Sequence, residues 1–179
     1  MLRLRNMQSR TDAYDSLRMR PENYRPYLVL LAGGVVIGAL DIAYAIAFWF
    51  MRSGTHPSRI FQSIAAGILG RAAFAGGIKT VLLGALLHYF IAIVVVAVYW
   101  ACSRRTAALL QRPYIFGAAY GLGVYCVMNY IVVPLSAARA PSFILVWVLC
   151  SVVVHAGLIG IPSALFSRAA MRLSTPRAQ

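Results

Sequence analysis

The sequence predicts an all-α fold, a bundle of four transmembrane helices with a short additional helix between the first and second spans. Three observations lead to this prediction. Hydrophobic residues make up 61% of the 179 residues and charged residues only 12%, too few to cover a water-facing surface. Four apolar segments are each long enough to cross a bilayer, and the mean hydropathy of the chain is +0.74. The charged residues gather in the N-terminal tail and in the breaks between these segments.

Residues 1–26 form a basic tail ahead of the first apolar segment. They hold six arginines and three of the four acidic residues of the chain. The tail contains no apolar stretch, so we expect no cleaved signal peptide. Pro21 and Pro26 disfavour a helix that continues through them. We expect a cytoplasmic tail that is attracted to anionic lipid heads by about 1 kcal/mol for each basic residue near the surface.

The predicted membrane domain covers residues 27–168 as one unit. Its segments are continuously apolar rather than alternating, and every backbone group inside a bilayer must find its partner within the protein, so the spans are expected to be helices. A cytoplasmic C-terminal tail is expected at residues 169–179. The predicted spans are residues 27–51, 80–102, 114–137 and 142–166.

A further helix is predicted at residues 57–76, between the first two spans. Pro57 and Ser58 are typical of a helix start. Arg59, Gln62 and Ser63 share one side at helical spacing, whereas the isoleucines of the segment lie largely on the other. Its apolar part is too short to cross, so an interfacial or a shallow re-entrant helix is expected. Two roles stay open, a helix that packs on the outer surface and a lid over a pocket.

The basic residues between the spans predict the orientation. With the N-terminus inside, twelve basic residues lie on the inner side and five on the outer side. Because cytoplasmic segments of membrane proteins carry the excess of Lys and Arg, both termini are expected in the cytoplasm. We expect a multi-pass protein of the bacterial inner membrane.

Each predicted span carries one strongly polar residue: Asp41, His88, Asn129 and His155. A central Asp costs about 2.5–3.5 kcal/mol in hydrocarbon on insertion scales, so such residues face protein or water. Counted at about 1.5 Å per residue, their depths are close enough for one intramembrane cluster, to which Tyr125 on the third span is added. This cluster is either a packing network or a site for a proton, an ion or a solute.

Small residues accompany the polar ones at helical spacing. Close helix packing in membranes uses such small residues, so these positions are expected at helix–helix contacts. A second copy of the chain or another membrane protein is a candidate partner through a GxxxG face. The predicted packing glycines are Gly34, Gly38, Gly84, Gly117 and Gly121.

Several function classes are not expected. The chain has no GxSxG, HExxH, CxxC or phosphate-binding glycine loop, so no catalytic residue is assigned and we expect no enzyme. Its three cysteines form no pair typical of a metal site. The net charge of +13 is explained by membrane topology and lipid contact rather than by nucleic acid. A haem b between His88 and His155 is weighed, but their estimated depths differ by about one helical turn, so no cofactor is expected.

Three stretches resemble the YagU-like family of bacterial inner-membrane proteins. They are LHYFIAIVVVAVYW (residues 87–100), Pro134-Leu135, and HAGLIGIPSALFSR (residues 155–168). The resemblance covers the second to fourth spans and implies a small inner-membrane protein whose biochemical activity is not established. His88 and His155 match histidines of the corresponding helices in that family. Asp41 and residues 56–77 have no counterpart in the resemblance.

Three functions remain open from the sequence. The first is a non-enzymatic accessory or structural membrane protein that works through helix contacts. The second is a small transporter or proton-responsive protein that uses Asp41 and the histidines of the spans. The third is a b-haem protein. Asp41 is the only acidic residue after Glu22, which makes it the most informative position.

Overall fold

The described part of the chain is almost entirely helical and contains no strand. The structure is a computed structural model, and it describes residues 24–138 and 144–174. Four helical stretches are long and apolar enough to cross a membrane, as predicted. The elements are α2 (Arg25–Ser53), α3 (Pro57–Leu69), the 3-10 helix η1 (Gly70–Ala75), α4 (Gly77–Ser103), α5 (Ala108–Gln111), α6 (Pro113–Val127), the π-helix η2 (Met128–Val132), α7 (Val133–Leu135), α8 (Leu145–Val154), the π-helix η3 (His155–Gly160) and α9 (Ile161–Ser174).

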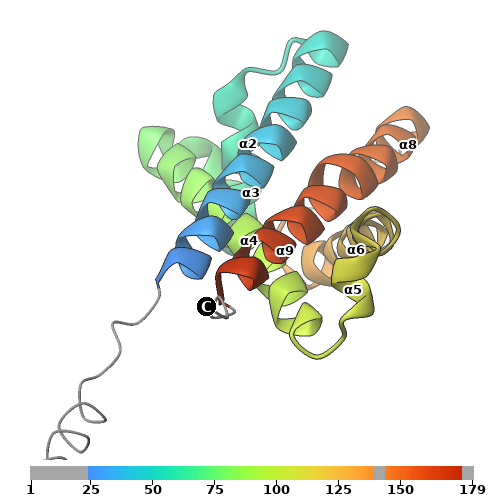
Figure 1. Cartoon of the computed structure of the whole chain (residues 1–179). Helices are drawn as coiled ribbons and strands as arrows, with labels where there is room; N and C mark the ends of the chain where they lie inside the picture. The colour runs from blue at the N-terminus through green and yellow to red at the C-terminus, as the bar shows by residue number, and fades with distance from the viewer. Residues whose placement is uncertain (1–23, 139–143, 175–179) are drawn as a thin grey trace, which may run out of the picture.

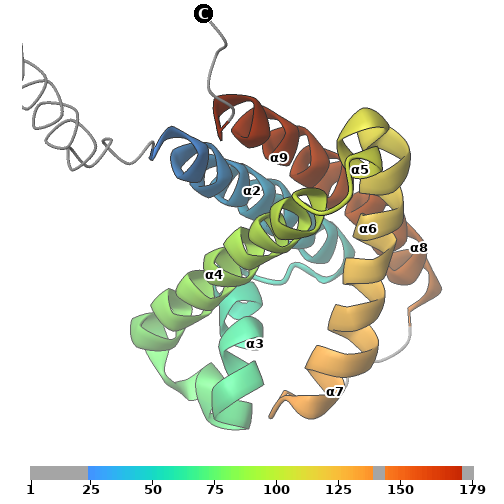
Figure 2. The same ribbon diagram turned by 60° about the horizontal axis from the view of Figure 1, so that its bottom comes forward.

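The first span, α2, lies antiparallel to the last, which is formed by α8, η3 and α9, so that the end of α9 lies beside the start of α2 (Figure 1). α4 crosses α2, and α6 packs against η3 and α9 (Figure 2). The core of this bundle is a cluster of buried apolar side chains contributed by three of the four spans. It contains Leu30, Ile37, Val96, Ile159 and Ala170.

Large apolar side chains cover the outside of the bundle. On α4, Leu82, Leu86 and Phe90 are 62%, 69% and 61% exposed and share one face at helical spacing. The opposite face of α4 is turned inward and carries the buried Gly84 and Ala92. A water-soluble helix shows the reverse pattern, so this surface is the one expected against lipid.

The additional helix α3 packs against the first half of α4. Its buried residues include Gln62, whose side-chain Nε2 donates to the Gly77 carbonyl and to Thr80 Oγ1, both at 3.4 Å. The Gly67 carbonyl of α3 accepts a hydrogen bond from the Ala137 amide at 2.9 Å, beyond the end of the third span. α3 is therefore held between two spans by its polar and small residues.

Several boundaries differ from the predicted ones. α2 starts at Arg25, because Pro26 lies in its first turn, where a missing N–H costs no helical hydrogen bond. The predicted helix over 57–76 is interrupted at Gly70, which has a φ of +59°. The last span continues to Ser174 instead of ending at 166, because Ala170 is fully buried against α2. The rest of the predicted tails, 1–23 and 175–179, lies outside the described residues.

Candidate functional site

A cavity of about 280 Å³ lies between the spans and takes residues from α2, α3, α4, α6, α8 and both π-helices. Three of the predicted polar residues line it: Asp41, His88 and His155. Each comes from a different span, so the four-helix packing brings them together. The remainder of the lining is largely apolar or aromatic, as is usual for a small-molecule site with few polar groups.

His88 is positioned by the contact between α2 and α4. Gly38 faces the Tyr89 ring and Ala92, so a Cβ at this position would lie 2.8 Å from Tyr89 Cδ1. This close approach lets the imidazole reach the backbone of α2, where Nε2 lies 2.8 Å from the Gly38 carbonyl oxygen. A carbonyl only accepts, so Nε2 carries the proton and Nδ1 is the nitrogen left with the lone pair in the neutral ring.

His155 is positioned within its own helix. Its Nδ1 donates to the Ser151 carbonyl at 2.8 Å, which leaves Nε2 with the lone pair in the neutral ring. The ring of Tyr125 meets the imidazole edge to face, with centroids 5.3 Å apart. Gly121 of α6 faces the backbone of His155 and Ala156, so α6 touches the helix at the point where this side chain leaves it.

Asp41 lies within electrostatic range of both histidines. Within the described residues its carboxylate makes no hydrogen bond and no ion pair, because the two imidazole N–H groups are bonded to backbone carbonyls instead. The fully buried polar side-chain atoms without a partner in this part of the chain are Trp100 Nε1 and Ser167 Oγ. The oxygens of Asp41 are therefore open to the cavity.

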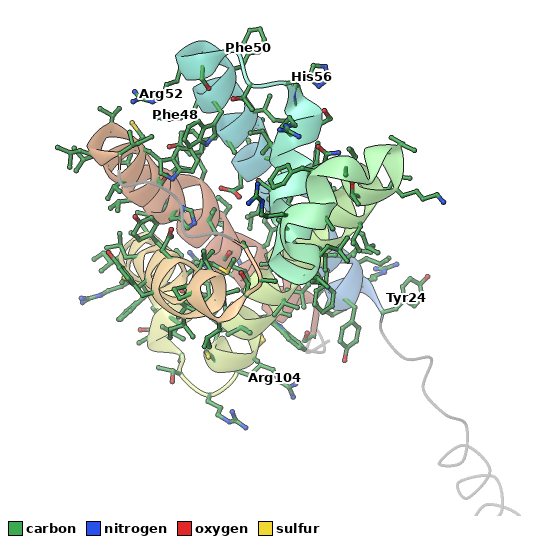
Figure 3. All side chains as sticks on the ribbon, turned by 180° about the vertical axis from the view of Figure 1, so that it is seen from behind. Tyr24, Phe48, Phe50, Arg52, His56 and Arg104 are labelled. Atoms are coloured by element: carbon green, nitrogen blue, oxygen red, sulfur yellow. The ribbon has the colours of Figure 1, made fainter. Side chains whose placement is uncertain are left out.

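Aromatic side chains form one wall of the same cavity. The rings of Tyr44 and Trp147 are stacked, with centroids 5.3 Å apart and planes at 9°. Trp49 and Phe48 pack on Trp147 at 5.4 and 4.8 Å, and Figure 3 shows Phe48 between α2 and α8. The Tyr44 hydroxyl and Ser151 Oγ lie 3.2 Å apart and share a hydrogen bond, which joins α2 to α8 beside Asp41.

A second cavity of about 670 Å³ adjoins the first, and the two share lining residues such as Ile91 and Trp147. Asn129 lines this second cavity and not the first, and its Nδ2 donates to the Tyr125 carbonyl at 2.9 Å. Arg59 of α3 also lines it, with its guanidinium 4.9 Å from the centre of the Phe74 ring. The helix α3 thus forms part of the wall of both cavities.

Two widened turns interrupt the third and fourth spans where they border the cavities. Met128 and Asn129 belong to η2, and His155 belongs to η3. Each π-helix is followed two residues later by a proline, Pro134 or Pro162. Proline lacks an N–H and its ring crowds the carbonyl four residues earlier, and a wider turn relieves both effects. Such turns recur at functional sites.

The residues of the predicted intramembrane cluster do not all lie in one cavity. Asp41, His88 and His155 share the inner cavity, Tyr125 packs behind His155, and Asn129 lies in the adjoining cavity. The glycines also divide. Gly34 and Gly38 face α4, and Gly117 and Gly121 face the last span, but Gly84 faces the Phe61 backbone of α3 rather than another span.

The aromatic wall was not among the predicted site residues. A signal was present, because Asp41 and Tyr44 are three residues apart, and Trp147, Ser151 and His155 follow one another at intervals of four. Both spacings place side chains on one helix face. The sequence did not show that these two faces meet.

Comparison of the chain with known protein families, with curated proteins and with solved structures finds no match. The YagU-like resemblance therefore stays a prediction. Within the described residues, no group of three or more His, Cys, Asp or Glu side chains is arranged to hold a metal ion.

Proposed function

We propose that this protein is a small solute carrier of the bacterial inner membrane, with both termini in the cytoplasm, and that Asp41 binds the solute. The excess of basic residues on the side of the termini supports this orientation. Figure 3 places Arg52 and His56 at one end of the molecule and Tyr24 and Arg104 at the other. The protein works by binding and release and not by catalysis.

One observation carries this proposal: the Asp41 carboxylate faces a cavity between the spans without a partner among the described residues. An ion buried without compensation costs several kcal/mol, so a carboxylate kept at this depth needs a counter-charge, a proton or water. A cavity that admits a ligand supplies the counter-charge reversibly. That is the requirement of a binding site inside a carrier.

A purely structural or accessory role would require hydrogen bonds to the Asp41 carboxylate. A carboxylate that stabilises a bundle accepts hydrogen bonds from neighbouring helices, because unpaired polar groups destabilise it. Here the N–H groups of the two neighbouring imidazoles donate to the backbone carbonyls of Gly38 and Ser151 and not to Asp41. The geometry therefore favours a ligand-binding role over a structural one.

Cysteine accessibility tests the proposal without knowledge of the solute. Asp41→Cys is made in a chain whose Cys102, Cys126 and Cys150 are changed to Ser, and a charged, membrane-impermeant methanethiosulfonate is applied from either face of the membrane. Such reagents need a thiolate in contact with water. Leu86→Cys, on the lipid-facing side of α4, is the matched control.

We expect Asp41→Cys to react from both faces and Leu86→Cys to stay unreactive. Reaction from one face only would contradict carriage of a solute, and no reaction from either face would overturn the binding site. The absorption spectrum of the purified protein provides a separate test of the haem alternative. We expect no Soret band, and a band lost in His88 or His155 variants would refute the proposed function.

A further inference from the structure

We propose that the solute is an organic cation, such as a substituted ammonium ion, held by Asp41 against the aromatic wall of the inner cavity. This inference rests on the proposed function and adds the chemical class of the ligand. It draws on three features of the cavity: the hydrogen-bonding character of its polar residues, its aromatic wall and its size.

Asp41 and the two histidines provide the inner cavity with acceptors and a negative charge. Asp41 contributes two carboxylate oxygens, and each imidazole turns an N–H to a backbone carbonyl, Gly38 for His88 and Ser151 for His155. The remaining atoms, Nδ1 of His88 and Nε2 of His155, are lone-pair acceptors in the neutral ring. An anionic ligand finds repulsion here, whereas a cation with N–H or polarised C–H groups finds attraction.

The aromatic wall selects an organic cation over a bare metal ion. Cations bind over the rings of Trp and Tyr within about 6 Å of the ring centre, most strongly when water is excluded. Tyr44, Trp49 and Trp147 line the same cavity as Asp41. Three suitable metal ligands do not come together in the described residues, so a metal ion would lack its coordination shell.

The size of the cavity points to a small organic ligand. Its volume of about 280 Å³ lies near the lower end of the range of roughly 300–1,000 Å³ that ligand pockets occupy. A larger substituent has room in the adjoining cavity of about 670 Å³. The positive charge of Arg59 lies outside the inner cavity: this side chain lines the adjoining cavity, where its guanidinium lies over the Phe74 ring.

The test compares two ligands that differ only in charge. Benzyltrimethylammonium and its uncharged carbon isostere, neopentylbenzene, are titrated calorimetrically into the full-length protein in mild detergent. We expect the cation to bind at least about tenfold tighter than the isostere. Asp41→Asn is expected to weaken binding of the cation by about 30-fold, because one partner of a desolvated charge pair is removed.

Variants of Trp147 separate aromatic attraction from simple packing. Trp147→Leu is expected to weaken binding of the cation by about tenfold, and Trp147→Phe by distinctly less because a ring is retained. The melting temperature of each variant in detergent checks that the bundle still folds. Equal losses in the two folded variants would refute the contribution of the aromatic wall.

The outcomes also distinguish this inference from the proposed function. If both ligands bind equally, or only an anion such as benzenesulfonate binds, while Asp41→Cys is labelled from both faces, the cation class is wrong and the carrier stands. If Asp41→Cys is not labelled, the proposed function fails first. Tight, Asp41-dependent binding of the cation together with labelling supports both.

Discussion

Gly121→Ala tests how closely α6 packs against the last span at His155. A Cβ at residue 121 would meet the His155 carbonyl oxygen and would lie 2.7 Å from its carbonyl carbon and 2.9 Å from Ala156 Cα. Ordinary contacts begin at 3.4 Å and the carbonyl oxygen lies closer than the carbonyl carbon, so the two helices must separate by more than about 0.7 Å. The atoms met belong to backbone, which cannot rotate away. Overpacking of this kind typically costs about 1–3 kcal/mol.

Gly123→Ala is the matched control, because it lies on the same helix and a Cβ there meets nothing within 4 Å. Both changes gain the same helix propensity, up to about 1 kcal/mol, so the difference between them isolates the steric cost. Equilibrium unfolding, followed by circular dichroism as a denaturing detergent is titrated in, measures both free energies. We expect Gly121→Ala to be less stable by about 1–3 kcal/mol. Equal stabilities would refute the packing argument.

Two further changes probe the other supports of the cavity. Gly84→Ala forces α4 away from the Phe61 backbone, so we expect faster tryptic cleavage around α3. We also expect the free energy of unfolding to fall by about 1–3 kcal/mol relative to Gly123→Ala. An unchanged cleavage rate would show that this contact does not hold α3. Pro162→Ala restores a helical N–H, so we expect up to about 3 kcal/mol of added stability together with weaker cation binding as His155 shifts. Pro113→Ala is the control: Pro113 lies in the first turn of α6, so we expect its replacement to change neither the stability nor the affinity for the cation. An unchanged affinity in Pro162→Ala would contradict a role of the π-helix in positioning His155.

The spans and their inward faces could be predicted because hydrocarbon imposes simple demands. A stretch that crosses it must be long, apolar and helical, and the structure has four such stretches. A polar residue must turn away from lipid, which is why Asp41, His88 and His155 could be assigned to the interior before their distances were known. The predicted boundaries were less accurate, since helix ends depend on tertiary contacts such as that of Ala170 with α2.

The site itself depends on contacts between residues far apart in the chain. Asn129 was expected beside Asp41, but it lies in the π-helix ahead of Pro134 and lines the adjoining cavity. The aromatic wall forms only because Trp147 of α8 meets the C-terminal half of α2, more than one hundred residues earlier in the chain, as the bond between Tyr44 and Ser151 also shows.

By itself, the sequence determined that the chain forms apolar helices and that each span carries its polar group on an inner face, because these follow from the cost of placing charges and open backbone groups in lipid. Only the tertiary structure decided which groups compensate one another. Close packing of α4 on α2 brings His88 Nε2 within 2.8 Å of the Gly38 carbonyl, whereas His155 Nδ1 donates to the Ser151 carbonyl one turn earlier in its own helix. Together these bonds leave Asp41 open to the cavity, and no local pattern in the sequence encodes the bond between His88 and Gly38, which are fifty residues apart.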